Sequence, residues 1–433
     1  MLARIRSGTS TPRGACCSAH VTSKNVEIQV STRGGTDGEV MDNTARTFFE
    51  QTGIAVKHVS YGLEPEYWAK VQSLHATGQV ADVVWASTVN LHNFANRGIL
   101  SELDSLIKAD NYDLGDYVKA GLESMSLNGK LYGMPWGGHP GNAGLLYDAD
   151  LLNAAGFKAT EDPESLSDWT YETLKQAAVK CTQTAAGRAE VFGYSPGTDF
   201  LSLTNVLGAY GARFMTPDGK KLAIDTPAFL SAMNWVRDIF VVSKAGPAPG
   251  PDPTSTTNTN NELFASSKLA MVHSGYGGQF TPGEKVIGGK FKWNVALQPT
   301  GPAGKRGTTL TINGMAISVN SKHKDEAWQF VKWLMEPENQ IPIILSGGSR
   351  PALRTKVLDD PRLMSAMKAH KVFVKGIREA EPWQMPANFR WPEFNSTVSQ
   401  VFGGVWAGTQ TVEAAMPEAT KKLQEVLDKP AID

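Results

Sequence analysis

Residues 26–87 read VEIQVSTRGGTDGEVMDNTARTFFEQTGIAVKHVSYGLEPEYWAKVQSLHATGQVADVVWAS. This stretch holds three short apolar runs, separated by two segments whose apolar residues recur at helical spacing. The expected strands are Val26–Val30, Ile54–Val59 and Asp82–Trp85, and the expected helices are Glu39–Gln51 and Tyr67–Thr77. A strand-helix-strand-helix-strand order predicts right-handed crossovers, and therefore a parallel sheet covered by helices on both faces. Ligands of such sheets bind beyond the carboxyl ends of the strands.

The chain after residue 137 predicts a second block of strands and helices. Strands are expected at Gly144–Tyr147, Leu269–Val272, Trp293–Leu297 and Met315–Val319, and helices at Glu172–Thr182, Phe200–Tyr210, Ala228–Val242, Asp325–Met335 and Thr411–Leu427. Ala245–Asn260 is rich in Pro, Thr and Asn, so we expect an exposed loop there. The fold class is therefore α/β.

The composition excludes several classes of protein. The length of 433 residues favours two domains, and 42 Lys and Arg against 43 Asp and Glu give a net charge of -1. Nucleic-acid-binding proteins usually carry a basic excess, so we expect no nucleic-acid partner. The apolar runs are shorter than a bilayer span, and three Cys cannot provide a disulfide framework for a chain this long.

The amino terminus does not have the periodicity of a folded element. Residues 1–23 are basic and polar, so we expect a disordered leader or tether. Gly14-Ala15-Cys16 fits the end of a bacterial lipoprotein signal, but the apolar region that precedes such a cysteine is missing. Lipidation of Cys16 or Cys17 and an uninformative leader or mis-assigned start therefore both stay open. Cys181 falls in a helical pattern and is expected to be a core thiol.

Short motifs occur along the chain in a recognisable order. They include ADVVW at Ala81–Trp85, NGKLYGMP at Asn128–Pro135, LLYDADLL at Leu145–Leu152, DWTYETL at Asp168–Leu174, NGMAISV at Asn313–Val319 and AWQFVKWL at Ala327–Leu334. Together they resemble the family 1 extracellular solute-binding proteins of ABC importers, the group of maltose- and glycerol-phosphate-binding proteins. The resemblance runs from about Val26 to Leu427.

The resemblance implies a periplasmic-binding-protein-like fold, in which two discontinuous α/β lobes are joined by a hinge and enclose an interlobe ligand cleft. Lobe 1 is expected to comprise residues 24–136 plus 279–337, and lobe 2 residues 137–278 plus 338–433. The implied function is capture of a solute outside the cytoplasmic membrane, hinge closure, and delivery to the transmembrane permease subunits. We expect a monomer, either periplasmic or lipid-anchored to the outer face of that membrane.

The expected ligand is a carbohydrate, either a di- or oligosaccharide or a glycoside. Such a site needs aromatic faces for the apolar side of a pyranose and planar polar groups for its hydroxyls. Candidates at the ends of the first three strands are Arg33, Gly34, Thr36, Tyr61, Trp85, Ser87 and Thr88. The absence of a side chain at Gly34 permits close approach of a ligand to the backbone. Burial of Trp85 and a solvated turn at Arg33 are the structural alternatives.

Further candidates lie later in the chain, several of them in loops that the resemblance places at the cleft. They are Trp136, His139, Tyr276, Asn313, Arg350, Trp383, Trp391 and Asn395. The resemblance implies stacking platforms at Tyr276 and near Trp383 and Trp391. Packing at the hinge is the alternative for Trp136, and a purely structural hydrogen bond is the alternative for His139. Arg33 and Arg350 motivate a second ligand class, a polyol phosphate or other anionic sugar derivative.

Enzyme function finds little support in the sequence. Gly193–Gly197 reads GYSPG and matches the G-x-S-x-G nucleophile elbow, whose oxyanion hole uses the backbone N–H of the residue after the serine. Pro196 has no N–H, so the motif contradicts that mechanism. The common zinc, P-loop and dinucleotide motifs are absent, and we expect neither a metal nor a cofactor. A carbohydrate-active enzyme stays open as an alternative, because paired carboxylates cannot be excluded by sequence.

Overall fold

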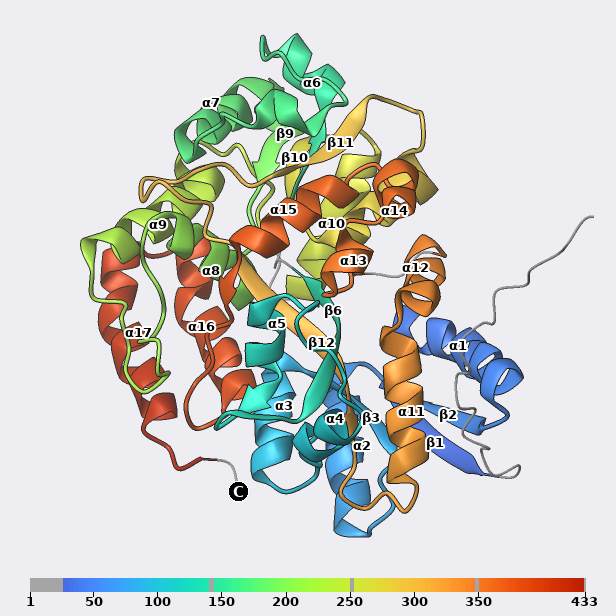
Figure 1. Cartoon of the computed structure of the whole chain (residues 1–433). Helices are drawn as coiled ribbons and strands as arrows, with labels where there is room; N and C mark the ends of the chain where they lie inside the picture. Colours follow the sequence, from blue (N-terminus) through green and yellow to red (C-terminus); the bar gives the residue numbers. More distant parts are fainter. Residues whose placement is uncertain (1–25, 140–143, 250–252, 347–349, 432–433) are drawn as a thin grey trace, which may run out of the picture.

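The computed structural model describes residues 26–139, 144–249, 253–346 and 350–431. A first mixed sheet occupies the lower half of the molecule in Figure 1, with strand order β13-β12-β3-β1-β2 and β6 paired to β12. Its strands are β1 (Glu27–Arg33), β2 (Ala55–Tyr61), β3 (Val83–Ser87), β6 (Gly133–His139), β12 (Thr309–Ile317) and β13 (Glu381–Pro382). Strand β1 is parallel to β2 and β3, as the strand-helix repeat predicts, whereas β12 is antiparallel to β3 and β6.

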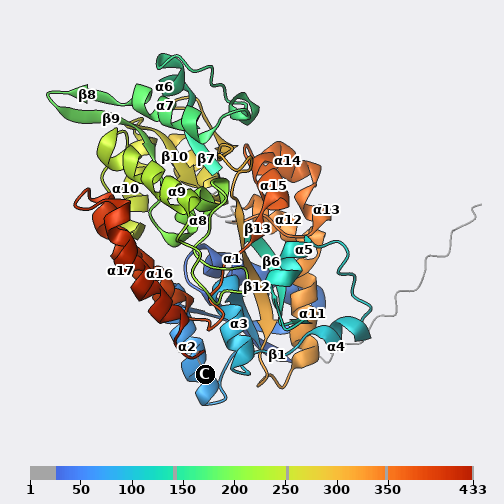
Figure 2. The same ribbon diagram turned by 90° about the vertical axis from the view of Figure 1, so that its left-hand side faces the viewer.

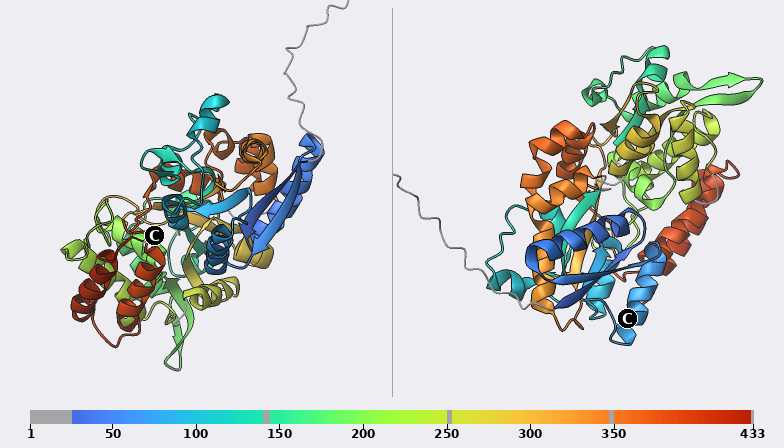
Figure 3. Two further views of the ribbon diagram at one scale, coloured as in Figure 1. Left: turned by 90° about the horizontal axis from the view of Figure 1, so that it is seen from below. Right: turned by 90° about the vertical axis from the view of Figure 1, so that its right-hand side faces the viewer.

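Helices cover both faces of this first sheet (Figures 1 and 3). They are α1 (Thr36–Thr52), α2 (Glu64–Ala76), α3 (Thr88–Asn96), α4 (Asp104–Ala109), α5 (Lys119–Ser124) and α11 (Lys324–Met335), with the small hairpin β4 (Ser126–Leu127) and β5 (Lys130–Leu131) beside them. Helix α1 ends at Gly53, whose φ of 76° is left-handed and whose N–H donates to the Phe49 carbonyl at 2.8 Å. Helix α1 therefore stops where the sequence predicts.

A second mixed sheet, of order β11-β7-β10-β9-β8, forms the upper half of Figure 1. Its strands are β7 (Gly144–Asp148), β8 (Gln183–Ala185), β9 (Arg188–Ser195), β10 (Leu269–Ser274) and β11 (Trp293–Leu297). Strands β9 and β10 are parallel, and β7 is antiparallel to both β10 and β11. The β8–β9 hairpin extends outward at the edge of this sheet (Figure 2).

The remaining helices pack mainly on the second sheet and between the two halves. They are α6 (Ala149–Ala154), α7 (Tyr171–Cys181), α8 (Phe200–Ala209), α9 (Pro227–Arg237), α10 (Pro253–Ala265), α12 (Pro337–Leu345), α13 (Thr355–Leu358), α14 (Pro361–Ala366), α15 (His370–Glu379), α16 (Trp391–Trp406) and α17 (Val412–Leu427). Among the described residues, none of the helices is both long and apolar enough to cross a membrane.

Each sheet has its own apolar core. In the first, Tyr67 and Trp85 are fully buried and meet edge to face with ring centroids 5.5 Å apart. In the second, Phe200 stacks on Phe214 at 4.9 Å, and Phe394 closes the group. Burying a large apolar side chain stabilises a fold by about 1.5–3 kcal/mol, so these aromatic clusters contribute to holding the helices against each sheet. Cys181 is buried in this second core, where burial raises the pKa of its thiol to about 12.

Three expectations about the elements differ from the structure. The expected loop Ala245–Asn260 is wrong in its second half, because α10 begins at Pro253. Thr and Asn are poor helix formers, but the completely buried Phe264 anchors this helix on β10, and tertiary packing overrides propensity. Strand β12 begins at Thr309 instead of Met315, so Asn313 lies inside a strand.

The third difference concerns β11. The expected lobe boundaries place Trp293–Leu297 in lobe 1, whereas this strand pairs with β7 in the second sheet. The chain therefore passes from the second sheet to the first between β11 and β12, later than expected. The first sheet also continues to His139, three residues beyond the expected boundary. The exact lobe division stays a prediction. Residues 1–23, with Cys16 and Cys17, lie outside the described residues.

Candidate ligand-binding site

A cavity of about 420 Å³ opens where the strand ends of the two sheets face each other. Its lining residues are Arg33, Ser87, Thr88, Val89, His139, Asp199, Leu201, Gly275, Thr311, Ile312, Asn313, Trp383, Trp391 and Asn395. Strands and helices of both sheets contribute to this set. A solute held here would touch both halves of the molecule at once, which suits a binding protein that closes on its ligand.

The first sheet supplies the wall formed by Arg33, Ser87 and Thr88. Arg33 ends β1, and its guanidinium lies 5.0 Å above the buried ring of Trp85. Ser87 caps α3, and both its N–H and its hydroxyl donate to Asn90 Oδ1, at 2.8 and 3.3 Å. The Thr88 hydroxyl donates to the Ile312 carbonyl at 3.2 Å and accepts from the Ile312 N–H at 2.8 Å. The side chains of Ser87 and Thr88 are therefore held in place by hydrogen bonds within the protein.

The second sheet supplies Asp199, Leu201 and Gly275, none of which the sequence analysis proposed. Asp199 is the N-cap of α8, where one carboxylate oxygen accepts from the Ser202 N–H at 3.0 Å and the other from its hydroxyl at 2.6 Å. Asp before an apolar helical run is a recognisable cap signal, and it could have placed Asp199 at this strand-to-helix turn. The sequence analysis also did not propose the lining residues Val89, Thr311 and Ile312, because they lie in apolar or strand-like segments that cannot be distinguished from core segments by sequence.

Two tryptophans form the aromatic part of the lining. The ring centroids of Trp383 and Trp391 lie 6.0 Å apart at 50°, and both rings contact Phe200, at 5.4 and 6.3 Å. Trp383 is mostly buried, whereas Trp391 keeps more of its surface exposed. Both indole N–H groups are buried and have no acceptor among the described residues. Trp391, at the start of α16, is therefore the better placed of the two to offer a ring face to a ligand.

Arg350 and Trp136 lie behind this lining. Arg350 is only 6% exposed, and its guanidinium lies 5.6 Å from the centre of the Trp136 ring. Its Nε donates to His139 Nε2 at 3.4 Å. The environment of the Asn313 amide places its oxygen toward Arg350, accepting from Nε at 3.0 Å and from Nη2 at 3.3 Å. His139 and Asn313 line the cavity, so Arg350 touches two of its lining residues without lining it.

The structure brings together Arg33, Ser87, Thr88, His139, Asn313, Trp383, Trp391 and Asn395 among the expected site residues. It does not place Gly34, Tyr61, Trp85, Trp136, Tyr276 or Arg350 in the cavity lining. Gly34 donates its N–H to the Gly62 carbonyl at 2.7 Å, and Trp85 is entirely in the core. The ring of Tyr61 lies 6.1 Å from that of Tyr67. The side chain of Thr36 is outside the described residues.

Tyr276, expected as a stacking platform, is fully buried instead. Its hydroxyl lies 2.8 Å from Nδ1 of His370, whose Nε2 is 3.0 Å from the Leu358 carbonyl oxygen. A carbonyl only accepts, so Nε2 carries the hydrogen and Nδ1 accepts from Tyr276. Desolvation lowers the pKa of His370, and its hydrogen bond to Leu358 offsets this in part.

Protonation of His370 gives a testable pH dependence. The unfolded histidine titrates near pH 6.5, about where a free imidazole does, whereas the native one has a lowered pKa. The unfolded chain therefore binds the proton more readily, and stability falls as the pH drops below about 6.5 toward the native pKa. We expect urea unfolding at pH 7.5 and 5.5 to show a larger loss of stability in wild type than in His370→Gln. Equal losses would contradict this account of His370.

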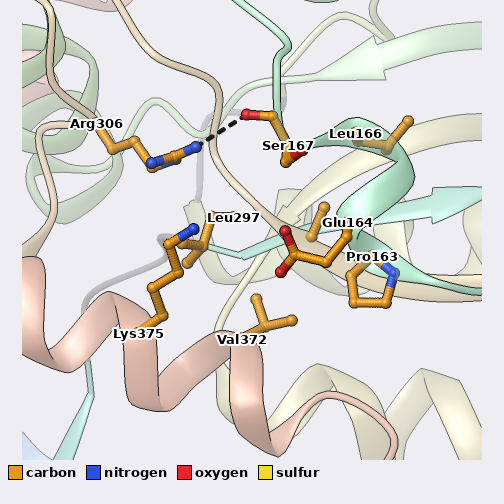
Figure 4. Close-up of a pocket in the computed structure, with 9 residues that line it drawn as sticks. Pro163, Glu164, Leu166, Ser167, Leu297, Arg306, Val372 and Lys375 are labelled. Carbon is orange, nitrogen blue, oxygen red and sulfur yellow. Dashed lines mark hydrogen bonds between the residues drawn. The ribbon is translucent and has the colours of Figure 1, made fainter.

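Two further features of the described residues do not form a second ligand site. A small cavity of about 20 Å³ lies between Pro163–Leu166, β11 and α15 (Figure 4), where Arg306 Nη2 donates to the Ser167 carbonyl at 3.1 Å. This is room for about one water molecule, not for a sugar. Within the described residues, His, Cys, Asp and Glu form no group of three or more that could hold a metal ion.

The G-x-S-x-G match is not a nucleophile elbow. Ser195 lies within strand β9 and is fully buried, with its hydroxyl accepting from Asn260 Nδ2 at 2.8 Å. A nucleophile must reach its substrate, and this hydroxyl is inside the protein. The structure therefore agrees with the sequence argument from Pro196.

Two α/β halves with opposed strand ends define the periplasmic-binding-protein fold. The sequence model of the bacterial extracellular solute-binding protein family matches residues 43–371, and the chain belongs to this family. This is a family of solute-binding proteins and not of enzymes, so the alternative of a carbohydrate-active enzyme is wrong.

Individual relatives are distant. A putative binding protein of Brucella abortus (strain 2308) is 24% identical over 82% of this chain and 81% of its own length. An uncharacterised lipoprotein of Streptomyces antibioticus is 25% identical over 77% of this chain and 74% of its own. An ABC substrate-binding protein of Listeria monocytogenes, solved in complex with cycloalternan, has a TM-score of 0.75 at 22% identity, covering 93% of this chain and 99% of that one. The structural likeness shows the fold alone.

Proposed function

We propose that this protein is the extracytoplasmic binding component of an ABC carbohydrate importer, and that its cavity takes a di- or oligosaccharide or a glycoside. The lining carries this proposal, since it combines the ring of Trp391 with planar polar groups on Arg33, Asn313 and Asn395. An aromatic face packs on the C–H side of a pyranose, and planar polar groups pair with its hydroxyls. The cycloalternan bound by the Listeria monocytogenes protein supports a carbohydrate ligand.

Hinge closure would trap the sugar, because the lining comes from both sheets. A ligand that binds the closed state better shifts the population toward it, and the closed monomer would then dock on the permease subunits. The chain would work in the periplasm or attached by lipid to the outer face of the membrane. The lipoprotein from Streptomyces antibioticus supports the second location, which would use Cys16 or Cys17.

The direct experiment is a titration of intrinsic tryptophan fluorescence with a panel of neutral sugars, with mass spectrometry of each mixture. We expect a saturable change with at least one sugar, which is recovered unchanged. Trp383 and Trp391 line the cavity and would report on its occupation. If no sugar of the panel gives a saturable fluorescence change, the proposal of a carbohydrate ligand is contradicted. If mass spectrometry detects a reaction product, the proposal that the protein binds its ligand without converting it is contradicted.

The second candidate ligand is a polyol phosphate or other anionic sugar, which the position of Arg33 in the lining favours. Arg33→Ala separates the two ligand classes. For a neutral sugar we expect a loss of about tenfold or less, whereas a charge-assisted bond to an anion is worth about ten- to a hundredfold. The measurement is calorimetric titration with maltotriose and with glycerol 3-phosphate at low and high salt. Unchanged affinity of Arg33→Ala for every bound compound would remove the main support for the anionic ligand.

A further inference from the structure

The walls of the cavity differ in their side-chain charge. Among the described residues of the lining, Arg33 is the one arginine, Asp199 is the one acidic residue, and there is no lysine. Arg33 ends β1 of the first sheet, whereas Asp199 precedes α8, whose apolar residues pack in the core of the second sheet. Arg350 adds a second positive charge behind the lining. A ligand in the cavity therefore meets more positive than negative side-chain charge.

Three helices add to this positive character, because each contributes its first turn to the lining. The lining residues concerned are Ser87, Thr88 and Val89 at the start of α3, Asp199 and Leu201 at the start of α8, and Trp391 at the start of α16. The N-terminal end of a helix carries a partial positive charge, equivalent to about half an elementary charge, that stabilises a nearby anion. Without Asp199, the arginines and the helix ends together would suit an anionic ligand.

The carboxylate of Asp199 opposes this attraction. Its two oxygens accept from the N–H and the hydroxyl of Ser202, at 3.0 and 2.6 Å, and both donors are neutral. Within the part of the chain that the structure describes, Asp199 forms no ion pair, so no cationic side chain directly compensates its charge. Glu393 in the first turn of α16 does not line the cavity, and it pairs with Arg390 and Lys429.

The N-cap of α8 does not by itself require a charged residue. Asn is about as good an N-cap as Asp, because its amide oxygen accepts from the same backbone N–H. Asp199→Asn therefore keeps the cap on Ser202 and removes the negative charge. Two unit charges about 10 Å apart, at an effective dielectric constant of about 20, change an equilibrium constant by about tenfold. A carboxylate in the wall thus weakens the binding of an anion that it does not touch.

We propose that Asp199 is a specificity-determining residue, whose carboxylate offsets the positive character of the cavity and selects neutral polyhydroxyl ligands over phosphorylated or carboxylated sugars. A sugar hydroxyl can donate to a carboxylate, whereas a phosphate dianion has no hydrogen to donate. The selection of ligands rests on the proposed function, since it assumes that the ligand lies in this cavity. Of the two ligand classes proposed above, it favours the neutral one.

The test compares Asp199→Asn with wild type by calorimetric titration with glycerol 3-phosphate and with maltotriose at low salt. We expect the affinity for glycerol 3-phosphate to rise about tenfold or more, and the affinity for maltotriose to rise less than about threefold or to fall. Asp162→Asn is the matched control. Asp162 caps the short helix Pro163–Leu166 through the Glu164 N–H at 3.1 Å and does not line the cavity, so we expect neither affinity to change.

The double variant Arg33→Ala with Asp199→Asn locates the effect. We expect it to lose the gain for glycerol 3-phosphate, because Arg33 lines the same cavity. A gain that persists in the double variant, an equal gain in Asp162→Asn, or no gain in Asp199→Asn would overturn the proposal. Asp199→Ser, which also supplies an N-cap without a charge, replaces Asp199→Asn if the latter melts at a lower temperature than wild type. If wild type binds no neutral sugar, the proposed function fails, while the response to glycerol 3-phosphate still decides the role of Asp199.

Discussion

Replacing Trp391 with alanine is expected to weaken sugar binding by about tenfold to a hundredfold. Trp391 lies in the cavity lining with part of its surface exposed, and its ring is backed by Trp383 at 6.0 Å. Buried aromatic anchors of this kind dominate binding energies, with losses of about 2 kcal/mol or more on truncation. Calorimetric titration with the tightest sugar of the panel measures the effect.

Two further variants make this result specific. Trp391→Phe keeps an aromatic face, and we expect it to retain most of the affinity. Trp169→Ala removes a half-buried tryptophan that packs on Phe157 at 5.4 Å and does not line the cavity, so we expect affinity to be unchanged. Equal affinities of Trp391→Ala and Trp169→Ala would contradict a role for Trp391 in stacking.

The largest expected effect on stability is that of Asp116→Ala, which breaks a buried ion pair. Arg354 Nε donates to Asp116 at 2.9 Å, and the two side chains are only 9% and 8% exposed. Arg354 also donates to the Met335 carbonyl at 3.1 Å and lies 5.5 Å from the centre of the Tyr117 ring. Removing Asp116 leaves the buried guanidinium with one charged partner, Glu336, whose more exposed carboxylate accepts from Nη1 at 3.2 Å. Breaking a buried pair costs about 3–5 kcal/mol, and because Glu336 remains we expect a loss near the lower end of that range.

Urea denaturation of Asp116→Ala, with Glu123→Ala as the control variant, measures this predicted loss of stability. Glu123 pairs with Lys119 on the surface of α5, where both side chains are more than half exposed, so its removal is expected to change little. We also expect the double variant Asp116→Leu with Arg354→Met to be less destabilised than Asp116→Ala, because it leaves no buried charge and the Glu336 carboxylate that also loses its partner is partly exposed to solvent. A loss for Asp116→Ala no larger than that for Glu123→Ala would contradict the assignment of this pair.

The sequence predicts β1, β2 and β3 of the first sheet well, because each is a short run bounded by a glycine or polar turn, whereas β6 and β13 have no counterpart among the expected strands. Strand β11 shows the limit of such reasoning. Trp293–Leu297 is recognisable as a strand, but its pairing with β7, almost 150 residues earlier in the chain, depends on contacts that no local pattern encodes. Helix α10 shows another limit, since its Thr and Asn residues are helical only because Phe264 is buried against β10.

The candidate site residues divide in the same way, into those that a local sequence pattern predicts and those whose position depends on distant contacts. Arg33, Ser87 and Thr88 could be predicted because they follow identifiable strands, and the structure places them in the lining. Tyr276 could not be predicted correctly, because its hydroxyl pairs with His370, 94 residues further along. Arg350 was expected to contact the ligand directly. In the structure it instead contacts two residues of the cavity lining, His139 and Asn313. Contacts with residues that are distant in the sequence decide whether a side chain faces the cavity or the protein interior.

The crystal structure of the protein with the tightest-binding sugar of the panel tests the central claim most directly. The account predicts sugar density in the cavity between the two sheets, in contact with Trp391 from one half and Arg33 and Asn313 from the other. A sugar bound elsewhere on the molecule, with this cavity holding only water, would contradict it.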